Sequence, residues 1–120
     1  MAKTTTEKGR MGEEMAIAYL KKKGFVILDT NWHFQHLELD IVAQDGNTLV
    51  FVEVKLRSTA YFGNPEEAIS RQKISRLMNA AEAYIFEKDF QGDSRFDVIS
   101  IITPYGKKPE LEYFEDAFLA

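Results

Sequence analysis

The chain has 120 residues, of which 45% are hydrophobic and 28% charged, and this composition indicates a single globular domain spanning 1–120. It contains no cysteine, which excludes disulfides, thiolate nucleophiles and cysteine-ligated zinc. Its net charge is −4, whereas most nucleic-acid-binding proteins carry an excess of basic residues. No apolar run could span a bilayer and no signal-peptide core begins the chain, so we expect a cytoplasmic protein without a membrane partner.

The first expected element is a helix over 7–23, which stops at Gly24 after three lysines. These lysines suit the negative end of the helix dipole, with phosphate contact as the alternative role. Glu13 continues the apolar face of Ile17 and Leu20, and a carboxylate on such a face needs a partner, for which a metal-bound water is one candidate. The other interpretation is a glutamate stabilised by the dipole in the first helical turn.

A short strand over 25–28 and then a β-hairpin are expected next. Two segments rich in branched apolar residues, 37–43 and 49–56, flank the turn sequence at 45–47. When the hairpin's charges share one face, the other face is uniformly apolar, as expected of a sheet surface covered by a helix. The members of that apolar face are Leu37, Leu39, Ile41, Ala43, Val50, Val52, Val54 and Leu56.

The charged face of the hairpin depends on the register of its strands. A two-residue turn at 46–47 places Asp40 across from Glu53, with Cβ atoms about 5 Å apart, and Glu38 across from Lys55. A turn one residue earlier sets Glu38 across from Glu53, whereas a three-residue loop would put Asp40 and Glu53 on opposite faces. Facing carboxylates repel unless a divalent cation binds them; the alternative is an exposed carboxylate–lysine ladder.

The remaining elements complete an α/β pattern. We expect a loop over 58–63 and a helix start at 64–67, followed by a helix over 71–86 whose apolar spacing indicates core packing. A buried strand over 95–102 should follow by a parallel crossover, and 111–114 should form an edge strand. The expected order is α-β-β-β-α-β-β, a mixed sheet of about five strands with helices on both faces.

Asp40 and Glu53 offer the oxygen ligands that magnesium prefers, and the backbone carbonyl of Val54 offers a third. Lys55 shares their face and is expected to stabilise negative charge rather than to act as a base. Lys73 suits phosphate contact near a helix N-terminus, with a solvated helix face as the alternative. This set favours phosphodiester hydrolysis with one or two Mg²⁺ (or Mn²⁺) ions over other reaction classes.

Asp40, twelve further residues and then Glu53-Val54-Lys55 match the PD-(D/E)XK signature of restriction-endonuclease-like nucleases. The wider sequence resembles the YraN family, small bacterial proteins related to Holliday-junction resolvases. The residues that carry this likeness are 9–13, Ala16, 38–40, 50–55, Arg57, 65–68, Lys73, 95–98 and 117–118.

The resemblance implies a restriction-endonuclease-like core and a site on the hairpin. The catalytic residues that it implies are Glu13, Asp40, Glu53 and Lys55. The expected substrate contacts are Lys73, implied as an auxiliary contact, with Arg57 and Arg71. The expected metal ligands are Asp40, Glu53, the Val54 carbonyl and Glu13, the last through a water.

These features predict a magnesium-dependent endonuclease acting on structured or branched DNA. A two-fold homodimer is implied by analogy with resolvases, which cut a junction symmetrically. The alternative is a catalytically silent module that binds nucleic acid or a protein partner. The acidic balance favours this alternative, as does Leu37, because the family usually has glycine there.

Overall fold

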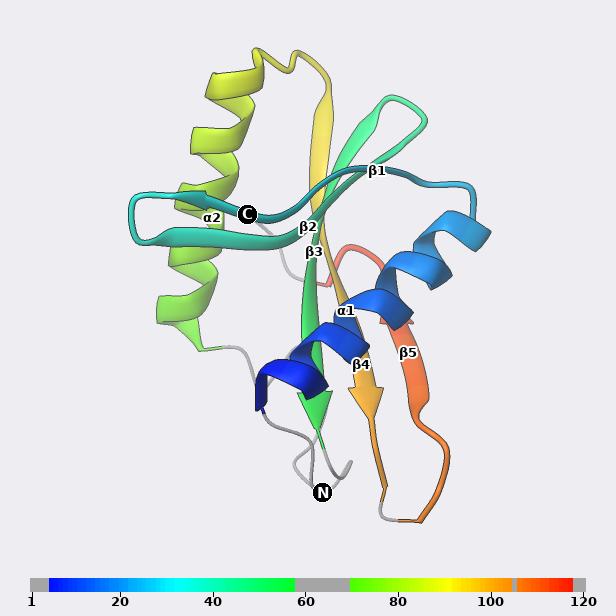
Figure 1. Cartoon of the computed structure of the whole chain (residues 1–120). Coiled ribbons are helices and arrows are strands. Elements are labelled where there is room, and N and C mark those ends of the chain that lie inside the picture. Colours follow the sequence, from blue (N-terminus) through cyan, green and yellow to red (C-terminus); the bar gives the residue numbers. More distant parts are fainter. Residues whose placement is uncertain (1–4, 58–69, 105, 118–120) are drawn as a thin grey trace.

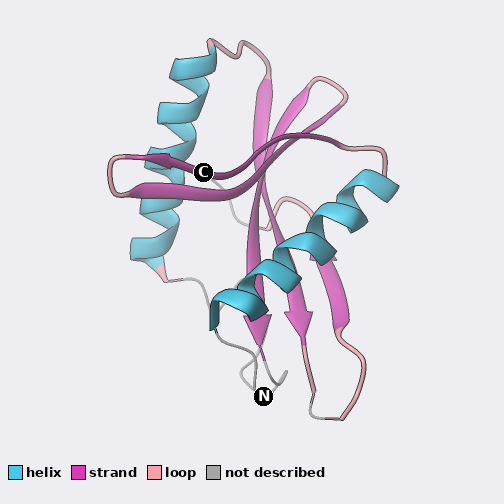
Figure 2. Ribbon diagram, in the orientation of Figure 1, coloured by secondary structure: helices cyan, strands magenta, loops and turns pink. Residues whose placement is uncertain are grey.

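The computed structural model describes residues 5–57, 70–104 and 106–117 (Figures 1 and 2). The elements are α1 (Thr5–Lys22), β1 (Val26–Phe34), β2 (Leu37–Asp45), β3 (Thr48–Arg57), α2 (Arg71–Lys88), β4 (Asp93–Ile102) and β5 (Glu110–Phe114). The strands form one sheet in the order β1-β2-β3-β4-β5, antiparallel except for the parallel pair β3–β4. The predicted α/β order is therefore confirmed, while the loop 58–63 and the helix start 64–67 lie outside the described residues.

Local signals end both helices. After α1 the chain turns at Gly24, whose φ of 96° is unfavourable for residues with a Cβ. At the start of α2 the Ser70 hydroxyl accepts a hydrogen bond from the Lys73 N–H at 3.1 Å, which satisfies one amide of the first turn. At its end Asp89 adopts a left-handed φ of 52° and its N–H bonds back to the last turn.

Each helix covers one face of the sheet (Figure 2). The α1 side buries Ala16 and Leu20 against β2, β3 and β4. The α2 side buries Leu77, Ala81 and Tyr84 against the opposite face of the same three strands. Because both faces are covered, the central strands are apolar on both sides, and a charged side chain among them needs a specific partner.

The β2–β3 turn has the first of the predicted registers, with Asp45 paired to Thr48. The ladder continues only to the pair Ile41–Val52. The predicted pairing of Glu38 with Lys55 is wrong, because the β2–β3 ladder ends before it; Glu38 pairs with His33 on the β1 side only. Beyond this point the β1–β2 hairpin lies beside α2 while β3 continues next to β4 (Figure 1).

The predicted single apolar face of the hairpin is wrong at its far end. Ile41 packs on the α1 side as predicted, but Leu37 and Leu39 pack on the α2 side, next to Val42. Leu39 and Ile41 are two residues apart and would share a face in a regular strand. The alternation therefore breaks at Asp40, where β2 leaves β3.

β1 is longer than the predicted strand over 25–28, because its far half is held by α2. The Trp32 ring packs edge-on against Tyr84 with centroids 5.2 Å apart, and the Tyr84 hydroxyl donates to the Asp29 carboxylate at 2.7 Å. These contacts offset the unfavourable strand propensity of Asp29 and Asn31. The hairpin thus bends away from β3 to complete the hydrophobic layer over α2.

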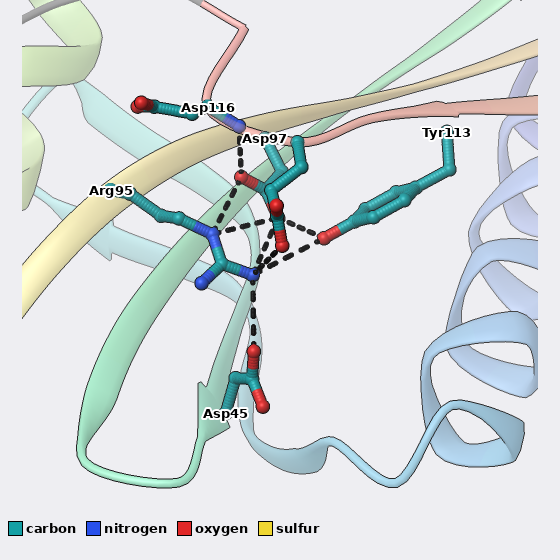
Figure 3. A network of polar contacts seen from close by, with 6 residues as sticks. Asp45, Arg95, Asp97, Tyr113 and Asp116 are labelled. Carbon is teal, nitrogen blue, oxygen red and sulfur yellow. Dashed lines mark hydrogen bonds and ion pairs between the residues drawn. The ribbon is translucent and has the colours of Figure 1, made fainter.

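A polar network binds β4 to its neighbours (Figure 3). Asp97 is fully buried and receives the Arg95 guanidinium at 3.1 Å and the Asp116 N–H at 2.8 Å, together with the Tyr113 hydroxyl. Arg95 also contacts Asp45 at the β2–β3 turn, at 3.3 Å. Hydrogen bonds and an ion pair thus offset the cost of burying the Asp97 carboxylate. The network acts as a structural clamp that joins β4, β5 and the β2–β3 turn.

Candidate active site

Asp40 lies where β2 separates from β3. The Val54 N–H donates to the Asp40 Oδ2 at 2.9 Å. The β2–β3 ladder has ended at Ile41–Val52, so the Asp40 side chain takes the place of a backbone acceptor from β2. This bond turns the Asp40 carboxyl toward β3 and leaves its second oxygen for other partners.

Glu53 comes close to Asp40 from the α2 side of β3. Its side chain is only 7% exposed, among Leu39, Phe51 and Leu77. Burial, the negative charge of Asp40 and a hydrogen bond between the two carboxyl groups raise the pKa of Glu53 to about 8, although the nearby lysine ammonium groups act to lower it. The two carboxyls therefore meet as the sequence predicts, but beyond the end of the ladder rather than as a ladder pair.

Two lysines neutralise part of this charge. The Lys73 ammonium, on the first turn of α2, lies 3.8 Å from the Glu53 Oε1 and is one-third exposed. Lys55 follows Glu53 by two residues on β3, is half-buried, and its charge also acts to lower the Glu53 pKa. Lys73, predicted as a substrate contact, is thus also the ion-pair partner of Glu53.

Glu13 reaches the site from α1. It is half-buried, and its Oε1 accepts a hydrogen bond from the Asn31 side-chain amide at 2.9 Å. The interpretation of Glu13 as a first-turn residue is wrong, because α1 begins at Thr5. The partner of the half-buried Glu13 is therefore Asn31. The sequence gives no signal for this contact, because it depends on how α1 packs against β1.

An open cavity of about 540 Å³ lies between α1 and the sheet. Its walls are formed by Gly9, Arg10, Gly12, Glu13, Glu14, Asn31, Asp40, Val54 and Leu56. Asp40 belongs both to this cavity and to the pair with Glu53, so it connects Glu13 on the α1 side with Glu53 on the α2 side. Within the described ranges, no group of three histidine, cysteine or acidic side chains is close enough to hold a metal ion.

The two arginines predicted to bind substrate lie at element ends. Arg57 ends β3 and is half-buried, with its carbonyl accepting from the Thr103 N–H at 2.7 Å. Arg71 begins α2 and is exposed. In the part of the chain that the structure describes, neither helix is long and apolar enough to cross a membrane.

Comparison with known proteins places this chain among relatives. Residues 12–101 match "Uncharacterised protein family UPF0102", and the match includes every predicted catalytic position. The chain belongs to the UPF0102 family. This confirms the resemblance to the YraN family, which is another name for UPF0102.

Individual UPF0102 proteins are similar over nearly their whole length. One from Flavobacterium psychrophilum is 44% identical over 110 residues, which are 92% of either chain. One from Bacteroides thetaiotaomicron is 46% identical over 114 residues, covering 93% of this chain and 92% of the relative. One from Syntrophomonas wolfei is 42% identical over 113 residues, covering 93% and 97%. The UPF0102 domain therefore accounts for most of each of these proteins.

Proposed function

We propose that this UPF0102 protein is a magnesium-dependent endonuclease that hydrolyses phosphodiester bonds in branched DNA. The observation that carries the proposal is the meeting of the Asp40 and Glu53 carboxyls beside Lys55 and Lys73. Two acids held this close destabilise the site in the absence of a cation, so the arrangement favours a function over a purely structural role.

The donor set fits a hard divalent cation. Asp40 and Glu53 supply only oxygen atoms, and Mg²⁺ needs one or two carboxylates because it keeps several waters. In a strand the N–H and C=O of one residue point to the same neighbour, so the Val54 carbonyl faces the side on which its N–H meets Asp40. Asp40, Glu53 and this carbonyl would hold the ion, with Glu13 acting through a water. When bound, Mg²⁺ or Mn²⁺ would neutralise phosphate charge and increase the acidity of a water molecule.

The basic residues have separate tasks in this proposal. Lys55 stabilises the negative charge that develops on the phosphate, because its ammonium group is on the same side of β3 as Glu53. Lys73 pairs with Glu53 in the free protein, and its ammonium group would be free to contact a phosphate oxygen if Glu53 held a cation instead. Arg57 at the end of β3 and Arg71 at the start of α2 bind phosphates of the DNA backbone.

A branched substrate is proposed because the motif resemblance described above implies a relation to junction resolvases. Symmetric cleavage of a junction requires two active sites, and a two-fold homodimer supplies them. The proposed location is the cytoplasm, where bacterial DNA lies.

The direct experiment incubates the protein with labelled branched and linear DNA of equal length, with Mg²⁺ and then with excess chelator. We expect Mg²⁺-dependent cleavage, with Asp40→Asn reducing the rate at least 100-fold because it removes an anionic ligand. Asp93→Asn makes the same chemical change at an exposed position on β4 and should cut like the wild type. Cleavage in the presence of chelator, or full activity of Asp40→Asn, would contradict the proposal.

A second candidate is a nucleic-acid-binding module without catalysis. The 7% exposure of Glu53 favours it, because a cation must displace the packing around this carboxyl. Such a module binds branched DNA equally well with chelator and with Mg²⁺, does not cut it, and loses affinity steeply as salt rises. Cleavage and the effect of chelator therefore separate the two candidates, because only the nuclease cuts DNA and needs the ion. Fluorescence anisotropy across a salt series tests what they share, and salt-independent binding would exclude both.

A further inference from the structure

Asn31 has an unusual backbone for a residue inside a strand. Its φ is 50°, in the left-handed region that asparagine tolerates better than other residues with a Cβ. Its neighbours Thr30 and Trp32 pair regularly with Ile41 and Leu39 of β2. Asn31 therefore lies between these two pairs, at the level of Asp40, where the hairpin bends.

The side chain of Asn31 points toward α1. Its amide nitrogen donates to the Glu13 Oε1 at 2.9 Å, which joins two residues 18 positions apart. Asn31, Glu13 and Asp40 come from β1, α1 and β2, and all three line the 540 Å³ cavity. The left-handed backbone of Asn31 thus accompanies an amide group at a wall of the cavity that carries a carboxylate from the helix and a carboxylate from the sheet.

A glutamate has three rotatable bonds, and a half-buried one keeps a single orientation only if a partner holds it. The Asn31 amide occupies one oxygen of Glu13 and leaves the other for a further contact. A neutral donor suits this role, because it orients the carboxylate and leaves its negative charge in place. A lysine would neutralise that charge.

We propose that Asn31 is a positioning residue, whose amide holds the Glu13 carboxylate toward the cavity beside Asp40. This inference rests on the proposed function, since the oriented Glu13 would help Asp40 to hold a cation, directly or through a water. Groups that orient metal-binding side chains in this way typically contribute a factor of about 10 to 100 in metal affinity.

The test measures Mn²⁺ binding by calorimetry and thermal unfolding without metal, for wild type and Asn31→Gly. Glycine keeps the left-handed backbone and removes only the amide, so the fold should remain intact. We expect Mn²⁺ affinity to fall about 10- to 100-fold. Gln35→Gly is the matched control, because Gln35 is an exposed amide residue with a φ of 56° in the turn of the same hairpin; this variant should bind Mn²⁺ like the wild type.

A purely structural role gives the opposite result. If Asn31 only joins β1 to α1, Asn31→Gly lowers the unfolding temperature and leaves Mn²⁺ affinity unchanged, which overturns the inference. If wild type and Asp40→Asn bind Mn²⁺ equally, the proposed cation site itself is wrong and the inference falls with it. The two failures are thus distinguished by the Asp40→Asn titration.

A double variant adds a second criterion. Asn31→Asp alone sets two carboxylates against each other and should lower both stability and Mn²⁺ affinity. Combining it with Glu13→Gln restores a hydrogen bond between the two positions but moves the charge from α1 to β1. We expect the unfolding temperature to recover and the Mn²⁺ affinity to stay low; recovery of both would show that the bond matters and the place of the carboxylate does not, against the proposal.

Discussion

At the scale of single residues, the state of Glu53 near neutral pH is decided by its surroundings. Burial among apolar side chains disfavours its charge, and the Asp40 carboxylate adds to this effect, so that its pKa is raised to about 8. Lys73 compensates only in part, since its ammonium group is 3.8 Å away and partly exposed to water. The ionised form of Glu53 is therefore disfavoured in the protein without a cation, mainly by burial and by the neighbouring charge of Asp40.

This raised pKa predicts a pH dependence of stability. The unfolded chain ionises Glu53 near pH 4.5, whereas the folded protein does so only near pH 8. Its contribution to the free energy of unfolding is therefore fully present below pH 4.5 and is lost as pH rises to about 8. Glu53→Gln cannot ionise at this position, so its free energy of unfolding should depend less on pH. At pH 8.5 that free energy should exceed the wild-type value by an amount on the order of a few kcal/mol.

Urea unfolding at pH 5 and at pH 8.5, without divalent ions, measures this difference. Glu82→Gln is the control, since Glu82 is exposed on α2 and should change neither value. A Glu53→Gln protein that is less stable than the wild type at pH 8.5 would show that the ionised carboxylate stabilises the fold, which contradicts a raised pKa of Glu53.

At the scale of elements, the sheet is held together by a polar clamp as well as by its hydrophobic layers. Asp97 of β4 is fully buried, yet it contacts Arg95, the Tyr113 hydroxyl of β5 and the backbone of Asp116. Burial is the largest cause that raises the pKa of Tyr113, and the hydrogen bond to Asp97 adds to it, so this hydroxyl remains a donor at all ordinary pH values. β5 and the segment after it are thereby fastened to β4.

Removal of the Asp97 charge should destabilise the protein strongly. Asp97→Asn leaves Arg95 with less compensation and weakens two further hydrogen bonds, so we expect a loss of about 3 to 5 kcal/mol. Denaturant unfolding measures it, with Asp93→Asn as an exposed aspartate on the same strand that should cost less than about 0.5 kcal/mol. Equal stability of the two variants would show that the clamp contributes nothing net.

At the scale of the whole molecule, the candidate site lies where β2 changes the helix against which it packs. Near the turn, β2 pairs with β3 and gives Ile41 and Ala43 to the α1 side. Farther along, the hairpin turns to pack Leu39 and Trp32 on α2. Asp40 lies between these two segments, so its side chain meets groups from both sides of the sheet.

A cation that binds at this junction should stabilise the whole fold. By mass action, an ion at about 100 times its dissociation constant adds roughly 2.7 kcal/mol to the free energy of unfolding. We expect Mn²⁺ to raise the unfolding temperature of wild type, chelator to reverse the rise, and Asp40→Asn to abolish it. An equal rise in wild type and Asp40→Asn would place the ion elsewhere.

Much of this architecture is predictable because its signals are local. The apolar spacing of α2 and the glycine after α1 mark the helices, and the turn sequence at 45–47 sets the β2–β3 register at its first pair. Extended by one residue, the same register points to the meeting of Asp40 and Glu53, although the ladder itself ends at Ile41–Val52. The failures lie at the far end of the hairpin, where Leu37 and Leu39 follow the strand alternation in sequence and yet pack on the other helix.

The sequence by itself determined the order of the elements, the covered sheet and the proximity of two carboxyls, since periodicity and turn chemistry act over a few residues. Only the tertiary structure decided that β2 leaves β3 at Asp40, that Lys73 pairs with Glu53 and that Asn31 holds Glu13. Each of these depends on how helices far apart in the chain pack on the two faces of one sheet. Packing of that kind is a property of the assembled core and leaves no pattern in any short segment.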